Sequence, residues 1–378
     1  MYRHCVRSTS GTTVKAANPD YVDGSSYTDL PLPDWNTPAK WCTGQGAKLI
    51  ESEGKQLREE NHKMDMSLLK VFVDTDQRDA TTANSLLTGL ADKDGIYVSK
   101  VEYFPLLFNA NEPNYGKGVC DAADGQLVSA QKQRRLDTTP MPMGIGLAGD
   151  MNQTRYTEVL ELMESFIGIG AAGPLTDLAS PPYLNKTNGQ LTGAPGVMKL
   201  FAQNLLYAYA SGIPYKTHAP ASREQIYQLS SWIYWYRQIN EIPAVLVPEK
   251  ACGVLSIIMT LLDTSKRRNV IYVGHDSDLD ALAHFFQLRW KAPPFPGPRP
   301  TPPGSSLVFS PNSDGTALVH FAYQDFDSTD DSEVKVVPAI PCRVDLHEAQ
   351  AFIEKQIIQL AGRGCLKGCR RTLSRFRV

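Results

Sequence analysis

Residues 268–288 have the sequence RNVIYVGHDSDLDALAHFFQL, in which a strand pattern is followed at once by a helix pattern. The β-branched and aromatic run at the start predicts a buried strand over Asn269–Val273. The residues from about Ser277 onward have the apolar spacing of a helix. A strand, a short turn and a helix form one unit of an α/β fold, so this segment already indicates the fold class.

A second unit of the same kind lies earlier in the chain. The run LLKVFVD over Leu68–Asp74 predicts a buried strand. The following TDQRDATTANSLLTGL predicts a helix that is capped by Asp74 or Thr75 and ends near Gly89. A further helix is expected from Gly46 to Lys63, after a long loop over residues 9–47 that is rich in Gly, Pro, Ser and Thr.

The C-terminal third contains three more strand-like runs, SSLVFS, TALVHFAYQ and SEVKVVPA, before a helix and a basic tail. Between the two α/β regions the pattern is mostly helical. We therefore predict an α/β domain formed by residues 1–108 and 246–378, and a mostly helical insertion domain over residues 109–245. Five aromatic residues in the insertion have helical spacing, which favours helix packing over a ligand platform. They are Tyr227, Trp232, Tyr234, Trp235 and Tyr236.

The composition excludes several classes of protein. The chain has 378 residues with 38 Lys and Arg against 40 Asp and Glu, a net charge of −2, whereas dedicated nucleic-acid binders carry a basic excess. The longest apolar run, Ala251–Leu262, is shorter than the roughly 20 residues that span a bilayer. We therefore expect neither a nucleic acid nor a membrane as a partner.

Seven cysteines is an odd number, so at least one thiol is free, pairs between chains or has its partner outside this chain. No Cys or His cluster has the spacing of zinc ligands, so no metal site is expected.

Two segments match the pattern G-x-G-x-x-G, Gly144–Gly149 and Gly168–Gly173. A dinucleotide site needs a strand before these glycines and a helix after them. The first match follows PMPM, and the second follows a helical stretch and runs into Pro174. A nicotinamide-dependent oxidoreductase is therefore the weakest of the alternatives considered.

Three short motifs carry the chemistry, and the first is Arg3-His4-Cys5-Val6-Arg7. Neighbouring guanidinium groups disfavour a protonated imidazole, so they would leave His4 neutral and able to act as a nucleophile. The two arginines would bind a dianionic group of oxygens. A surface basic cluster is the simpler explanation if this motif is taken alone.

The other two motifs follow the predicted strands: Gly274-His275-Asp276, and the segment from Asp74 to Arg78. Taken alone, Asp276 could cap the next helix, and Arg78 could form a structural ion pair with Asp74 or Asp76. Ligands in α/β sheets collect at the carboxyl ends of the strands. Three arginines and two histidines converging there indicate a phosphoryl-binding site.

The segments RHCVRS, VDTDQRDATTANSLLTGL, VGHDSDL and TPPGSSLVF, in this order, resemble the histidine acid phosphatases, the second branch of the histidine phosphatase superfamily. The similarity is greatest to the bacterial periplasmic phytase and glucose-1-phosphatase type. The resemblance implies a histidine phosphatase-like three-layer α/β domain, a smaller helical domain and an active site between them. It implies no metal and no cofactor.

The resemblance also implies a role for each motif residue. His4 would attack phosphorus and form a phosphohistidine intermediate, and Asp276 would protonate the leaving oxygen. The phosphoryl oxygens would be bound by Arg3, Arg7, Arg78 and His275. The expected function is a metal-independent acid phosphatase whose partner is a small phosphorylated substrate, either phytate, a sugar phosphate or another phosphate monoester.

The sequence departs from the family pattern R-H-G-x-R-x-P at two positions, because Cys5 replaces the glycine and Thr9 replaces the proline. A side chain at residue 5 is expected to narrow the pocket. The alternative function is therefore a catalytically impaired relative that binds phosphorylated ligands. The lysine of the phytase subgroup is also missing from its expected place, Ser10–Thr13, with Lys15 further on, which leaves the substrate open.

The resemblance implies an extracytoplasmic protein, secreted or periplasmic, where disulfides form. No signal peptide is visible in MYRHCVRSTSG. The family has an apolar strand before the first motif, whereas only Met1 and Tyr2 precede Arg3. We therefore expect that the given chain is truncated at its N-terminus or begins at an internal methionine.

Overall fold

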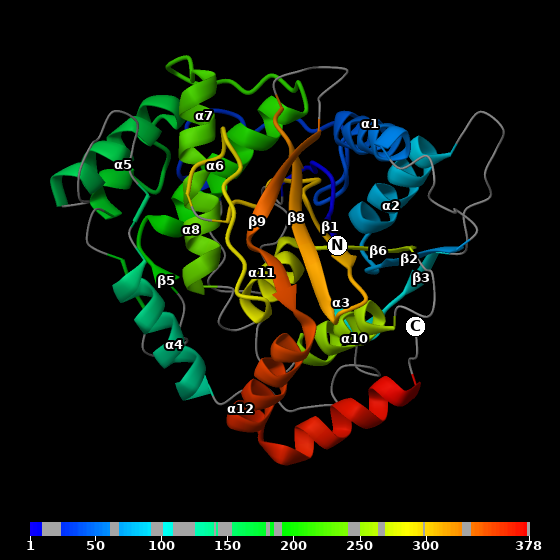
Figure 1. Ribbon diagram of the computed structural model, residues 1–378. Helices are drawn as coiled ribbons and strands as arrows, with labels where there is room; N and C mark the ends of the chain where they lie inside the picture. The colour runs from blue at the N-terminus through cyan, green and yellow to red at the C-terminus, as the bar shows by residue number, and fades with distance from the viewer. Residues whose placement is uncertain are drawn as a thin grey trace.

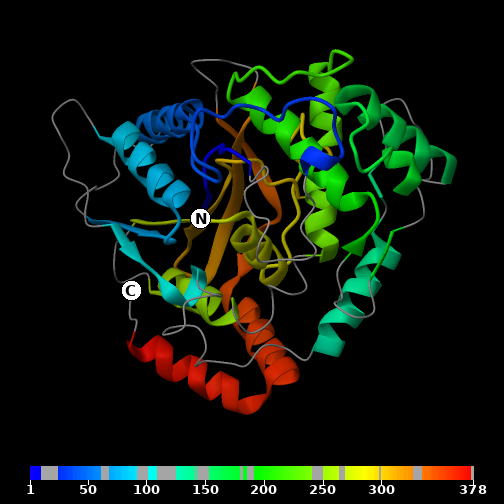
Figure 2. The same cartoon turned by 180° about the vertical axis from the view of Figure 1, so that it is seen from behind.

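The computed structural model of the chain places a mixed sheet at the centre, with helices on both faces and a group of helices to one side (Figures 1 and 2). Predictions that concern Lys63, residues 10–23 with Lys15, and the glycine motif at 144–149 lie outside the described residues. The structure describes residues 1–9, 24–60, 68–91, 101–108, 125–139, 141–142, 153–178, 182–184, 191–240, 250–263, 269–297, 299–326 and 334–375.

The central sheet has seven strands in the order β3-β2-β6-β1-β7-β8-β9. The first four strands in this order are parallel: β3 (Val101–Tyr103), β2 (Leu69–Val73), β6 (Asn269–Gly274) and β1 (Tyr2–Arg3). The last three pair antiparallel: β7 (Ser306–Pro311), β8 (Thr316–Gln324) and β9 (Val334–Asp345). The predicted strands are thus confirmed, and β1 lies in the middle of the sheet.

Side chains alternate between the two faces of the sheet along β2 and β6, and helices cover both faces, which gives three layers. Val71 and Ile271 point to one face of the sheet, where they form a buried cluster with side chains of α1 (Gly44–Glu60) and α2 (Gln77–Leu90). Phe72 and Tyr272 point to the other face and stack with their ring centroids 5.3 Å apart. Both residues join the larger core, which includes buried residues of α10 (Ala251–Leu262), α11 (Asp276–Phe285) and α12 (Leu346–Arg375).

Helices dominate the described part of residues 109–245. They are α4 (Gly125–Thr138), α5 (Gln153–Ile167), α6 (Pro195–Ala210), α7 (Arg223–Leu229) and α8 (Ser231–Asn240). A small hairpin, β4 (Tyr183–Leu184) and β5 (Leu191–Thr192), lies among them. Helices α5 to α8 lie on the opposite side of the molecule from α1 and α2 (Figure 1). The stripe of aromatic residues packs as predicted, because Tyr227, Trp232, Tyr234 and Trp235 are buried and Tyr236 is partly buried.

Short elements connect these parts: the 3-10 helices η1 (Gly24–Ser26) and η3 (Leu175–Leu178), and α3 (Pro105–Phe108). The C-terminal α12 consists of two helical pieces, because Gly362 adopts φ 81° and ψ 167°. None of the helices in the described ranges is long and apolar enough to cross a membrane.

One expectation about local structure is wrong. The N-cap of α2 is Asp76 rather than Asp74 or Thr75, and its side chain makes no capping hydrogen bond. The reason is that Asp76 pairs with Arg78, while Asp74 contacts His275. The prediction for the second glycine motif is confirmed, because Gly168–Gly173 follows helix α5 instead of a strand and so lacks the geometry of a dinucleotide site.

Two disulfides join described cysteines, Cys5–Cys42 and Cys252–Cys369. Cys342 on β9 is free and exposed. The odd number of cysteines predicts at least one unpaired thiol, and Cys342 on the edge strand β9 is one.

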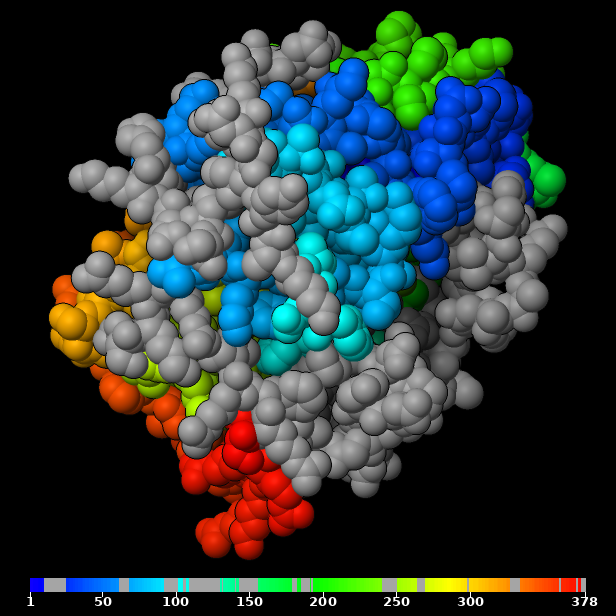
Figure 3. Space-filling model, turned by 90° about the vertical axis from the view of Figure 1, so that its right-hand side faces the viewer, coloured from blue at the N-terminus to red at the C-terminus, as the bar shows by residue number. Residues whose placement is uncertain are grey.

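Helices α1 and α2, which form much of the surface in Figure 3, approach each other closely through Gly54 and Gly89. A Cβ on Gly89 would lie 2.0 Å from the Glu51 carbonyl oxygen, so one helix would have to move. We expect Gly89→Ala to lower the free energy of unfolding by about 1–3 kcal/mol. Urea titration followed by circular dichroism measures this, with Gly44→Ala as the control because its Cβ would meet nothing within 4 Å. Equal midpoints for Gly89→Ala and the parent chain would contradict the prediction.

Candidate active site

The register of the parallel strands brings the three motifs together. Arg3 on β1 pairs with Gly274 on β6, and Val73 at the end of β2 pairs with Val273. The residues that follow these strands, His4, Asp74 and His275, therefore meet at one edge of the sheet. The rings of His4 and His275 lie 5.6 Å apart, centroid to centroid.

His4 is buried and has the environment of a neutral imidazole. Its Nδ1 lies 2.9 Å from the Cys5 carbonyl oxygen, and since a carbonyl only accepts, Nδ1 carries the hydrogen and Nε2 keeps its lone pair. Burial lowers the pKa of His4 well below its ordinary value, and the charges of Arg3, Arg7 and Arg78 lower it further. Nε2 is thus available as a nucleophile even in mildly acidic solution.

Three arginines surround this imidazole, as the motifs predict. Arg3, Arg7 and Arg78 each have a buried Nε–H for which the described residues offer no acceptor. Leaving a buried donor unpaired costs about 1–3 kcal/mol, so three of them beside one another indicate a site for a ligand rich in acceptor oxygens.

Asp276 is the first residue of α11, and the N-cap of this helix is His275. Asp276 therefore does not cap the helix. Its Oδ2 lies 3.1 Å from a terminal nitrogen of Arg3 and 3.1 Å from one of Arg237. Burial by itself would raise the pKa of Asp276, but the charges of Arg3 and Arg237 outweigh it and hold the pKa well below its usual range. Asp276 is therefore a carboxylate while Arg3 stays paired with it.

Three carboxyl groups lie near Nε2 of His275, while its Nδ1 lies 3.4 Å from a terminal nitrogen of Arg78. Nε2 of His275 lies 2.9 Å from Asp74 Oδ2, 3.5 Å from Asp76 Oδ2 and 3.8 Å from Asp79 Oδ2. Burial alone would lower the pKa of His275, but the hydrogen bond to Asp74 and the charges of Asp79 and Asp278 outweigh it and raise the pKa. The arrangement favours an imidazolium, which is a second kind of anion-binding group.

Asp74, Asp79 and His275 also have ligand atoms within 4.8 Å of one another, as metal ligands do. Asp79 is fully buried, and burial raises its pKa to about 7. We interpret this trio as the hydrogen-bonding environment of His275, in which Asp74 carries most of the negative charge in acidic solution.

Asp74→Asn removes the charge that faces His275 Nε2, and we expect the pKa of His275 to fall. Because the folded-state pKa is raised above the ordinary value of about 6.5, the imidazolium persists to higher pH in the parent chain and is lost at lower pH in the variant. NMR titration of labelled histidines measures this directly. We expect Asp79→Asn to shift the titration in the same direction, and an unchanged His275 titration in Asp74→Asn would contradict the assignment.

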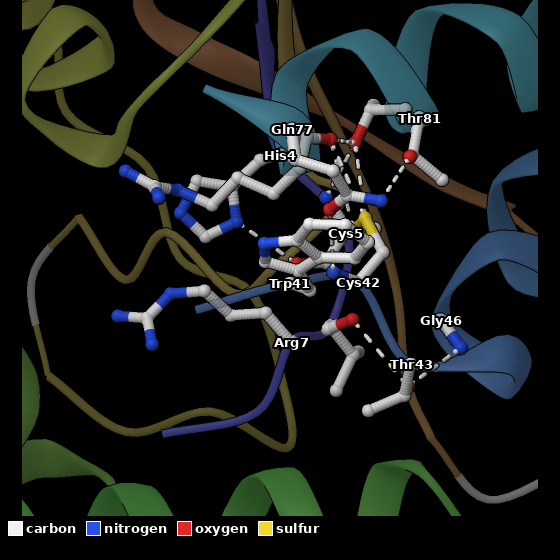
Figure 4. Close-up of a disulfide and its surroundings, with 12 residues drawn as sticks. His4, Cys5, Arg7, Trp41, Cys42, Thr43, Gly46, Gln77 and Thr81 are labelled. Carbon is white, nitrogen blue, oxygen red and sulfur yellow. Dashed lines mark hydrogen bonds between the residues drawn. A yellow bond between two sulfur atoms is a disulfide. The ribbon is translucent and has the colours of Figure 1, made fainter. Parts of the chain in front are cut away.

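Cys5 does not narrow the site, contrary to the expectation from the sequence. Its side chain points away from His4 toward α1 and α2, where it forms the disulfide with Cys42 and is fully buried (Figure 4). The direction of the side chain decides the outcome, because Cys5 packs in the buried cluster with side chains of α1 and α2.

Two residues of the site were not predicted, Arg237 on α8 and Tyr207 on α6. Arg237 is buried and binds Asp276, Asp280 and Thr301. A lone arginine in the apolar segment IYWYRQ is the signal that could have revealed it. Tyr207 accepts a hydrogen bond of 2.7 Å from Arg3 and lies with its ring 5.7 Å below the Arg7 guanidinium. No sequence pattern distinguishes Tyr207 from other buried aromatics.

Tyr207 holds two of the arginines at once, through its hydroxyl and its ring. We expect Tyr207→Phe to weaken the binding of inorganic phosphate by about 3- to 10-fold, because Arg3 loses a buried acceptor while the ring under Arg7 remains. Isothermal calorimetry with phosphate tests this. Tyr209→Phe on the same helix is the control, and equal affinities for all three proteins would contradict the role of the Tyr207 hydroxyl.

No protein-family model and no curated protein matches the sequence. Among solved structures, the chain is similar to the phytase of Hafnia alvei in complex with myo-inositol hexakis sulphate, with 20% identity, a TM-score of 0.73 and coverage of 96% of both chains. It is also similar to the phytase of Citrobacter braakii, with 22% identity, a TM-score of 0.71 and coverage of 96% of this chain and 97% of that one. The phytase of Klebsiella sp. ASR1 has 15% identity, a TM-score of 0.68 and 94% coverage of both chains.

At these identities the likeness concerns the fold. It extends over nearly the whole chain and includes the mixed seven-stranded sheet with helices on both faces. The chain therefore has the α/β fold of these phytases, which confirms the fold implied by its resemblance to the histidine acid phosphatases.

Proposed function

We propose that the protein is an acid phosphatase that hydrolyses small phosphate monoesters without a metal ion, through a phosphohistidine intermediate on His4. The observation that carries the proposal is the neutral, buried imidazole of His4 among three arginines that each keep an unpaired N–H. A phosphate dianion supplies acceptor oxygens to these donors and an electrophilic phosphorus to Nε2. The phytase fold of the chain supports the same class of reaction.

In the first step, Nε2 of His4 attacks phosphorus, and the P–O bond to the leaving group breaks. Arg3, Arg7, Arg78 and the imidazolium of His275 stabilise the charge on the equatorial oxygens. Water then attacks the phosphohistidine, and the P–N bond breaks to return neutral His4.

Asp276 would protonate the leaving oxygen and then take a proton from the attacking water. In the unliganded protein its pKa is low because Arg3 and Arg237 face it. A bound phosphate dianion competes for Arg3, which raises the pKa of Asp276 and makes its acid form accessible at acidic pH. This change of partner predicts an acidic optimum.

The alternative is a relative that binds phosphorylated ligands without turnover. It was motivated by the residue change at position 5, and the disulfide of Cys5 points away from His4, so this motive is weaker than the sequence implied. We further propose an extracytoplasmic location, because two buried disulfides form and persist in oxidising compartments.

The test is an assay of the purified chain on p-nitrophenyl phosphate, glucose 1-phosphate and inositol hexakisphosphate at pH 4–7 in excess chelator. We expect turnover of at least one ester, highest below pH 6 and unaffected by the chelator. Phosphate binding without turnover of any ester would favour the alternative. Loss of turnover in the chelator would overturn the metal-independent mechanism.

A further inference from the structure

We propose that the Cys5–Cys42 disulfide is a positioning element of the active site, which holds the loop of His4 and Arg7 against the segment that carries Arg78. This inference rests on the proposed function, because it assigns the disulfide a role in the same reaction. Three sets of contacts around the disulfide support this role, and Figure 4 shows the disulfide with Arg7, Trp41, Thr43 and Gln77 near it.

The first set joins the loop after β1 to residues 41–43. Arg7 and Cys42 form an antiparallel bridge, and the Ser8 amide donates to the Trp41 carbonyl oxygen at 2.9 Å. The Thr43 amide donates to the Val6 carbonyl oxygen at 3.0 Å. The disulfide lies directly beside this bridge, so it ties together two short segments that share few hydrogen bonds.

The second set joins the disulfide to the first turn of α2. Cys42 Sγ lies 3.3 Å from the Arg78 carbonyl oxygen, and Cys5 Sγ lies 4.0 Å from the same atom. The Cys5 amide donates to the Thr82 hydroxyl at 2.8 Å, and that hydroxyl donates to the Arg78 carbonyl oxygen at 2.7 Å. The Cys42 amide donates to the Gln77 side chain at 3.2 Å.

The third set is a close approach between α1 and the loop after β1. A Cβ on Gly46 would lie 2.3 Å from the Val6 carbonyl oxygen, so only glycine allows this approach. The nucleophile and two of the phosphate-binding arginines thus depend on one small region that contains Cys5, Cys42 and the start of α1.

Catalysis requires these groups at near-attack geometry, and a displacement of about 1 Å can cost on the order of 100-fold in rate. Without the disulfide, no covalent bond between residues 5 and 42 holds these segments in register, and the hydrogen bonds described above and the packing of the buried cluster remain. We therefore expect loss of the disulfide to reduce turnover beyond its effect on folding.

The experiment compares Cys5→Ala/Cys42→Ala with the matched control Cys252→Ala/Cys369→Ala. Each variant lacks one disulfide, and the control disulfide joins α10 to α12 and contains none of the motif residues. Kinetics on p-nitrophenyl phosphate are measured at a temperature at which circular dichroism shows every protein folded. We expect kcat/KM of the first variant to fall at least about 10-fold, mainly through kcat, and that of the control to stay within about 2-fold.

A second pair of variants leaves both disulfides intact. Gly46→Ala places a Cβ against the Val6 carbonyl, and Gly54→Ala, on the same helix, places one at the same 2.3 Å from the Leu86 carbonyl. We expect both to lower the melting temperature but only Gly46→Ala to lower kcat. This pair keeps the inference testable if the cysteine variant does not fold.

Hydrogen exchange distinguishes failure of the inference from failure of the proposed function. If the parent chain shows no turnover, the proposed function fails. Faster exchange of the backbone amides of residues 5 and 43 in the cysteine variant than in the parent chain would still support the positioning role. If the parent chain turns over its substrate and the folded cysteine variant keeps its kcat and its exchange rates, the positioning role is overturned. Equal kcat losses in Gly46→Ala and Gly54→Ala would also overturn it.

Discussion

His4→Ala is expected to abolish turnover of p-nitrophenyl phosphate, with kcat/KM reduced by at least about 10⁴-fold. Alanine removes Nε2, the proposed nucleophile. In the parent chain Nε2 carries no hydrogen, because the hydrogen is on Nδ1, which donates it to the Cys5 carbonyl oxygen. The arginines remain, so the variant should still bind inorganic phosphate. The measurement is the initial rate in chelator at acidic pH, together with calorimetric binding of phosphate.

A control and a trapping experiment make this result specific. His347→Ala changes an exposed histidine at the start of α12 and should leave the rate unchanged. Rapid alkaline quenching of the parent chain during turnover, followed by mass spectrometry, should find phosphate on the peptide that contains His4. Unchanged turnover in His4→Ala, or a phosphate on another residue, would eliminate His4 as the nucleophile.

Asp276→Asn is expected to have an effect that depends on the leaving group. Asparagine keeps the size of the side chain and loses its proton transfer, so we expect kcat/KM for an alkyl ester such as glycerol phosphate to fall by about 10²- to 10⁴-fold. For p-nitrophenyl phosphate, whose leaving group needs little protonation, the loss should be about 10-fold or less.

The two substrates serve as controls for each other, because a general disturbance of the site would affect both. Asp276→Asn also removes the carboxylate that pairs with Arg3 and Arg237. If this pairing were the only role of Asp276, the losses on both esters would be equal. That outcome would argue against proton donation and assign Asp276 to the positioning of the arginines.

Much of the fold follows from local patterns. The apolar runs of β2 and β6 and the helices after them have the periods of a buried strand and an amphipathic helix, which neighbouring residues determine. The meeting of His4, Arg78 and His275 also follows, because parallel strands place their carboxyl ends at one edge. The cap of α2 was misplaced because the side chains of Asp74 and Asp76 are used by His275 and Arg78.

Other features depend on residues that are far apart in the chain. The sequence by itself determined the α/β class and the charged groups at the strand ends, because these depend on periodicity and on local order. Only the tertiary structure decided that Cys5 pairs with Cys42, that Arg237 faces Asp276 and that Tyr207 contacts two arginines. Such pairings depend on how α1, α6 and α8 pack in the tertiary structure, and this packing results from the sum of many weak contacts that no short motif records.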